Sequence, residues 1–61
     1  MAIRYFFNDE LAGRQAVADI QNLGYWAITF TSGLPNGAKI GVECSELAEG
    51  VCEVRFAEFL I

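Results

Sequence analysis

The side chains of this sequence that could do chemistry are two cysteines and a scatter of carboxylates. Cys44 and Cys52 do not form a CxxC motif, and the sequence has no histidine, which is the commonest general base and metal ligand. A thiol without a neighbouring base or cation is a weak nucleophile. We therefore expect a reduced pair of core thiols, no catalytic residue, no metal site and no cofactor; the chain is not expected to be an enzyme.

A glycine-rich stretch, GLPNGAK at residues 33–39, has some of the composition of a phosphate-binding loop. Its spacing does not match a Walker A motif, and no serine or threonine follows Lys39. The stretch also lies between two β-type segments, whereas a phosphate loop opens a helix. We interpret it as the turn of a β-hairpin.

The charges of the chain are mostly acidic, with eight acids against four bases and a formal net charge of −4. Such a balance opposes contact with phosphate backbones, so direct binding of nucleic acid is not expected. Glutamates are concentrated in the second half of the chain. The candidate partner-binding acids are Glu43, Glu46, Glu49 and Glu53.

Length and composition indicate one small domain spanning residues 1–61. The chain is 54% hydrophobic, which excludes disorder, yet a chain of this size is only marginally stable alone. A larger protein partner, or a second copy in a homodimer, is therefore expected. No signal peptide and no membrane-length apolar run is visible, so a cytoplasmic location without membrane contact is the expectation.

The pattern along the chain predicts one helix and four strands. Residues 3–7 alternate as a strand, and residues 9–22 change to a helical period, with Asn8 as the expected N-cap and Gly24 as the expected stop. The remaining predicted strands are 25–31, 38–44 and 51–57.

The hairpin turn is predicted from the loop length that keeps large apolar side chains on one face. A three-residue loop, 35–37, pairs Phe30 with Val42 and Ile28 with Cys44, so that these side chains share a face. Proline, asparagine and glycine in this order suit a type I turn followed by a left-handed bulge. The register of the next hairpin stays open, and its loop at 45–50 could hold a helical turn.

The fold class predicted is α+β, a two-layer β-α-β-β-β arrangement. One amphipathic helix packs on one face of a four-stranded, mostly antiparallel sheet. The predicted core is Ile3, Tyr5, Phe7, Ala16, Ile20, Leu23, Trp26, Ile28, Phe30, Ile40, Val42, Val54 and Phe56. The other face of the sheet is predicted to carry Arg4, Phe6, Tyr25, Thr29, Thr31, Lys39, Glu43, Glu53 and Arg55.

Exposed aromatic residues ringed by charge are typical of interface anchors, which adds Phe6 and Tyr25 to the acidic candidates. The function predicted is a non-enzymatic protein-binding module. Small acidic domains of this class are often inhibitors encoded by phages or mobile elements, which mask a surface, such as a nucleic-acid-binding one, of a larger host complex. The alternative is a self-assembling homo-oligomer with a small-ligand pocket between protomers.

Overall fold

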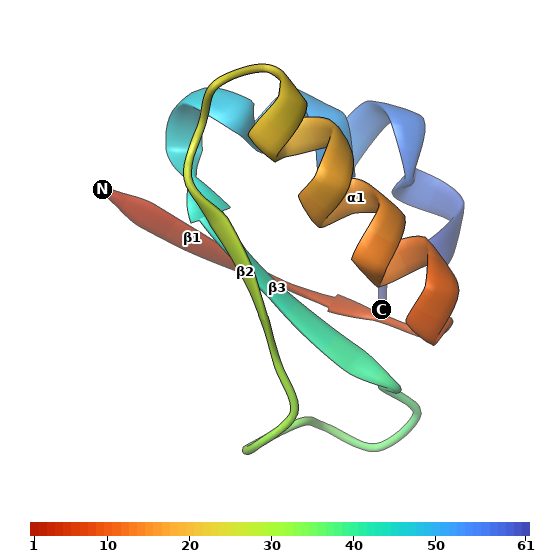
Figure 1. Ribbon diagram of the computed structural model, residues 1–61. Helices are drawn as coiled ribbons and strands as arrows, with labels where there is room; N and C mark the ends of the chain where they lie inside the picture. The colour runs from red at the N-terminus through yellow and green to blue at the C-terminus, as the bar shows by residue number, and fades with distance from the viewer.

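The computed structural model describes residues 1–61 and has two layers, a three-stranded antiparallel sheet and a helical layer that covers one of its faces (Figure 1). The strands are β1 (Ala2–Phe7), β2 (Ala27–Phe30) and β3 (Ile40–Ser45), in the spatial order β1-β3-β2. Helix α1 (Glu10–Asn22) connects the two outer strands. The α+β class and the single covering helix are thus as predicted.

The predicted fourth strand, 51–57, is wrong. After β3 the chain makes three short helical turns, at Glu46–Ala48, Val51–Arg55 and Ala57–Phe59, which we call the C-terminal turns. Ser45 starts them, because its hydroxyl accepts a hydrogen bond from the Leu47 N–H at 3.2 Å. The middle turn is π-helical, with Phe56 N–H donating to the Val51 carbonyl at 3.3 Å.

Helix α1 begins and ends close to the predicted positions. The N-cap is Asp9 instead of Asn8, and its carboxylate accepts a hydrogen bond from Ala12 N–H at 2.9 Å. At the other end, Gly24 has a φ of 90° and its N–H donates to Gln21, while the Tyr25 N–H donates to Ile20. This pair of bonds is a Schellman motif, which requires the left-handed glycine.

The helix lies close to the sheet because its buried stripe is made of small residues. Ala12, Gly13 and Ala16 are buried, and a Cβ on Gly13 would clash with the Ile40 side chain. The close approach leaves little room beneath the helix. Only small and medium side chains of the sheet, together with Phe7, are fully enclosed there.

The predicted register of the β2–β3 hairpin is wrong by one residue. Thr29 lies opposite Val42, and Phe30 lies opposite Gly41. The loop is longer than three residues: β2 stops at Phe30, β3 starts at Ile40, and the turn is closed by the Ala38 N–H donating to the Pro35 carbonyl at 3.1 Å. Gly37 does take the predicted left-handed conformation, with a φ of 90°.

A shift of one residue turns every side chain of β2 over. Three predicted core residues of this region, Trp26, Ile28 and Phe30, therefore lie outside the core, while Ala27 is buried beneath the helix and Thr29 also faces that side. Two further predicted core residues are also exposed, Leu23 at 53% and Val54 at 77%.

The core that forms is small and continuous. It contains Phe7, Ala12, Ala16, Ile20, Ala27, Ile40, Val42, Cys44, Ala48, Val51 and Cys52. The C-terminal turns supply part of it, and the tail then returns to β1, where Leu60 bridges to Phe7. None of the helices has the length and apolar character needed to span a membrane.

Candidate protein-binding face

One face of the sheet has no covering layer. Strand alternation directs eight residues to the side opposite α1. Six of them, Arg4, Phe6, Ile28, Phe30, Gly41 and Glu43, form what we call the outer face, and the other two, Ala2 and Ser45, lie at its end. The C-terminal turns pack on the same side of the sheet as α1, as Figure 1 shows. The outer face is therefore open to solvent or to a partner.

The centre of the outer face is a pair of aromatic rings over a glycine. The rings of Phe6 and Phe30 meet edge to face, with centroids 6.0 Å apart and planes inclined by 81°. The ring of Phe30 lies across Gly41, where an added Cβ would overlap the ring atoms. Gly41 is therefore required for the position of Phe30, since any larger residue would displace the ring.

A charged side chain also contacts the ring of Phe30. The guanidinium carbon of Arg4 lies 5.4 Å from the centroid of Phe30, within the range of a cation–π interaction. Arg4 also pairs with Glu43, with 3.5 Å between Nε and Oε1. The Arg4 side chain remains 66% exposed, so it is positioned by these contacts and still accessible.

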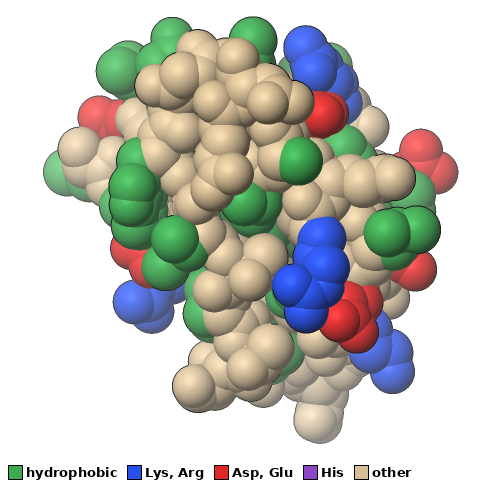
Figure 2. Space-filling view, in the orientation of Figure 1, with side chains coloured by type: hydrophobic (Ala, Val, Ile, Leu, Met, Phe, Trp, Pro, Cys, Tyr) green, Lys and Arg blue, Asp and Glu red, His purple; other side chains and the backbone are tan.

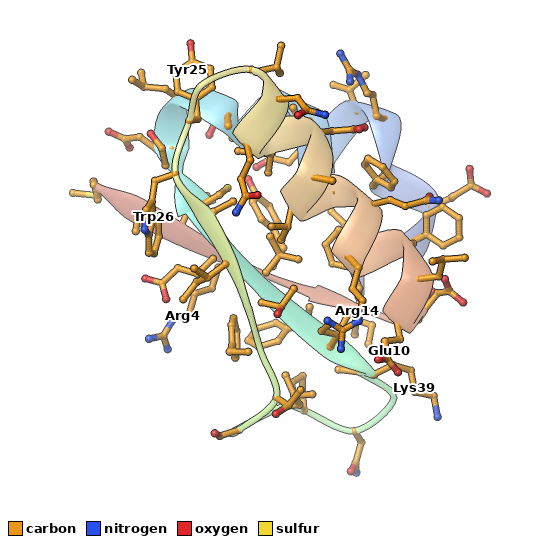
Figure 3. The ribbon with its side chains drawn as sticks, in the orientation of Figure 1. Arg4, Glu10, Arg14, Tyr25, Trp26 and Lys39 are labelled. Carbon is orange, nitrogen blue, oxygen red and sulfur yellow. The ribbon has the colours of Figure 1, made fainter.

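Large side chains extend the outer face at the start of β2. Trp26 is 52% exposed and Ile28 is 43% exposed. Figure 3 shows Trp26 and Arg4 on the side of the sheet away from α1, with Tyr25 at the far end of the helix. Trp26, Arg4 and Phe30 are residue types that commonly anchor protein–protein interfaces.

Of the predicted partner-binding residues, the structure brings two together on the outer face, Phe6 and Glu43. Tyr25 follows the helix. Glu46 and Glu53 belong to the C-terminal turns in the other layer, and Glu49 lies between the first two of these turns. The sequence prediction did not include Trp26, Ile28 and Phe30 in the site, because it placed them in the core, and it did not select Arg4. The available signal was Gly41 itself, because a glycine inside a strand indicates the close approach of another group.

The net negative charge is concentrated away from the outer face. Three of the four basic side chains form ion pairs, Arg4 with Glu43, Arg14 with Glu10 and Arg55 with Asp19. The acids outside these pairs, apart from the helix cap Asp9, all belong to residues 46–58. They are Glu46, Glu49, Glu53 and Glu58.

The buried titratable groups are held in their neutral forms. Burial raises the pKa of Cys44, and burial together with the neighbouring Cys44 raises the pKa of Cys52 to about 12. Burial likewise raises the pKa of Tyr5, whose hydroxyl donates a hydrogen bond to Glu53. Both cysteines are free thiols. The protein has no enclosed pocket and no group of three potential metal ligands.

Comparison with known proteins identifies no relative. No family model matches the chain, and neither a curated protein nor a solved structure matches it. The outer face is consequently interpreted from its own geometry alone.

Proposed function

We propose that this chain is a non-enzymatic protein-binding module that uses its outer face to dock on a larger protein. The observation that carries the proposal is the uncovered aromatic pair of Phe6 and Phe30, fixed against Gly41 and flanked by Arg4. A side chain that is already ordered in the free protein loses less entropy on binding, and this favours affinity.

The chemistry of the outer face suits a partner surface that is partly apolar. Trp26, Ile28 and Phe30 offer contact area, and the Arg4–Glu43 pair offers one donor group and one acceptor group at the rim. A partner that supplies a carboxylate to Arg4 would compete with Glu43 for the same guanidinium. Arg4 thereby contributes specificity more than affinity.

The acidic C-terminal turns support a second contact region within the same proposal. In that version Glu46 and Glu49 face a basic surface of the partner, such as one that normally binds nucleic acid, and the chain acts as an inhibitor by masking it. The support is the concentration of unpaired acids in residues 46–58.

The test is affinity capture with pairs of matched variants, read by quantitative mass spectrometry on lysate of the source organism. Arg4→Glu changes the outer face, and Arg14→Glu makes the same change on the exposed side of α1. Trp26→Ala is matched by Leu47→Ala, which truncates another exposed apolar side chain, 75% exposed, in the C-terminal turns. We expect the amount of captured partner to fall at least about tenfold with Arg4→Glu and with Trp26→Ala. Both control variants should capture the same amount as the native chain.

Two outcomes would change the proposal. A partner that is retained with Arg4→Glu and Trp26→Ala but lost with Glu46→Lys and Glu49→Lys would move the interface to the acidic turns. A partner retained with all of these variants would exclude both regions. Circular dichroism of each variant checks that the fold is intact.

A further inference from the structure

The two edge strands of the sheet, β1 and β2, differ in how far their outward-pointing backbone groups are covered. On the outer side of β1, the tail closes half of the edge: Asn8 N–H donates to Phe59 at 2.8 Å, and Ile61 N–H donates to Phe6 at 2.9 Å. The other half of that edge carries one charged residue, Arg4, whose side chain lies over the outer face against Phe30 and Glu43. Charges and covering segments are two ways in which proteins keep sheet edges from pairing with other chains.

The edge at β2 has backbone groups without partners. The Ser45 N–H donates to the Trp26 carbonyl at 3.0 Å, so the alternation of an antiparallel ladder directs the backbone groups of Trp26, Ile28 and Phe30 toward β3. The backbone groups of Ala27 and Thr29 consequently point out of the sheet. The Gln21 side chain donates to the Ala27 carbonyl at 3.0 Å, which leaves the Ala27 N–H and both groups of Thr29 open.

Apart from the shortness of β2, which has four residues, and the Gln21 side chain on the Ala27 carbonyl, this edge lacks the devices that discourage pairing. No charged residue occurs from Ile20 to Ala38, and no proline occurs before Pro35. Figure 2 shows charged side chains on both flanks of the strip that follows β2 and none within it. In Figure 1 no segment lies in front of β2. An uncharged strand with open backbone groups is a template for a further strand.

We propose that the open edge of β2 pairs with β2 of a second copy, antiparallel, around a two-fold axis at Ile28. Ala27 of one copy then exchanges backbone hydrogen bonds with Thr29 of the other; the Ala27 carbonyl has a second lone pair to accept one beside Gln21. On the outer face, Ile28 meets its own equivalent and Trp26 meets Phe30. The outer faces of the two copies become continuous across one six-stranded sheet.

A second copy fits this edge, because its own β2 presents the same open backbone groups and adds no acid to the contact. Each chain carries a formal charge of −4, so two copies repel each other unless the contact excludes their acids, and the segment 20–38 is the long stretch that does so. The two-fold pairing leaves the two β1 edges at the ends of the six-stranded sheet, and the tail covers half of each. Growth beyond the dimer would have to use these half-covered edges.

The test is amide hydrogen exchange by NMR on the full chain at rising concentration, with sedimentation equilibrium in parallel. We expect the amides of Ala27 and Thr29 to exchange rapidly in the monomer and to become protected, together, as the dimer forms. Ile28 and Phe30 amides are expected to be protected at every concentration, since they bond to β3. Salt should strengthen the dimer, because it screens the repulsion between the acidic layers.

A pair of matched variants checks the location. Ile28→Lys places two ammonium groups at the two-fold axis and should weaken dimerisation at least about tenfold, whereas Val54→Lys on the opposite layer, at a residue that is 77% exposed, should leave it unchanged or slightly tighter. Because the introduced ammonium group would face Glu43 across the strands, the monomer fold should survive. A synthetic chain with N-methylated Thr29 removes the edge donor without altering any side chain.

Three results would overturn the proposal. The first is a monomer at millimolar concentration, and the second is a dimer in which Ala27 and Thr29 stay unprotected. The third is protection of these amides only when another protein is added, which would assign the edge to a different partner. Partner capture is a separate readout, because Arg4→Glu leaves the backbone groups of Ala27 and Thr29 unchanged, although the Arg4 side chain contacts Phe30 of β2.

Discussion

The two faces of the sheet are built from different residues and differ in what they can do. The face beneath α1 carries Ile40, Val42 and Cys44, all with no exposed surface, in contact with a helix stripe of alanine and glycine. The outer face carries aromatic and charged side chains that are half-buried or exposed, and no element covers them. The face beneath α1 is closely packed against the helix. On the outer face, a few large side chains contact one another.

The difference indicates that in this short chain one face of the sheet supplies the stabilising core and the other face presents the large side chains. Small helix residues allow close packing, which makes a core from few residues, but they leave no room for Trp26, Ile28 and Phe30. These large side chains are consequently placed on the opposite face. A surface rich in ordered aromatic groups results from the same packing that stabilises the fold.

The largest expected effect is on the buried face. Ile40→Ala should cost about 2–5 kcal/mol of unfolding free energy, because it removes methyl groups from a site with no exposed surface. For a domain of this size that is most of the total stability. Ile28→Ala, at a 43% exposed residue of the outer face, should cost less than about 1 kcal/mol. Urea unfolding of both variants at low concentration gives the comparison; equal losses would contradict it.

The reaction rate of the two cysteines with a thiol reagent tests the burial of the face beneath α1 on the native chain. Cys44 and Cys52 have no exposed surface, so a thiol reagent should modify them about 100- to 1,000-fold more slowly than an unfolded cysteine. The pKa of Cys52 is raised from 9.0 to about 12, and that of Tyr5 is raised as well. The stability gained from the protonated thiol is therefore complete below pH 9 and is lost as the pH rises toward 12.

The check is a denaturation series from about pH 7 to about pH 12 on the native chain and on Cys52→Ala. The variant should be less stable near neutral pH and should lose less stability on going to high pH. A native chain whose unfolding free energy does not change over this range, or whose thiols react immediately, would contradict the burial of this face.

A smaller effect is expected at the centre of the outer face. Gly41→Ala should cost about 1–3 kcal/mol, because the new Cβ occupies the position of the Phe30 ring. In a Phe30→Ala background the same change should cost much less, since there is no ring to displace. A double-mutant cycle measures the coupling. Absence of coupling would show that Phe30 does not lie over Gly41.

The smallest expected effect on stability is at the ion pair. Arg4→Gln should change the unfolding free energy by less than about 1 kcal/mol, because the pair with Glu43 is exposed and screened by salt. The same variant should weaken partner binding if the outer face is the interface. Thermal unfolding and binding measured on one sample compare the two quantities, and a variant that unfolds the domain would contradict the assignment.

Periodicity predicted the elements whose pattern is set by local chemistry. Strand β1 and helix α1 follow from alternation, a capping acid and a left-handed glycine, which act within a few residues. The segment 51–57 also alternates, yet it is helical, because Ser45 caps a first turn and Val51 and Cys52, neighbours in sequence, both pack into the core beside α1. A short alternating run is compatible with both structures.

The candidate site depended on one register that local chemistry does not determine. The assumption of a three-residue loop placed Phe30 opposite Val42, whereas the real loop runs from Thr31 to Lys39. Long loops leave the register to packing, and here the close helix accepts Ala27 and excludes Trp26. The face of β2 could not be derived without the distance between helix and sheet.

The central claim is that β2 directs its large side chains away from the helix. A nuclear Overhauser experiment on the free chain at low concentration tests it most directly. The Phe30 ring is predicted to show contacts to the Gly41 Hα, the Phe6 ring and the Arg4 side chain. Contacts from the Phe30 ring to Ala16 or Ile20 of α1 would place it in the core and contradict the outer face together with its proposed function.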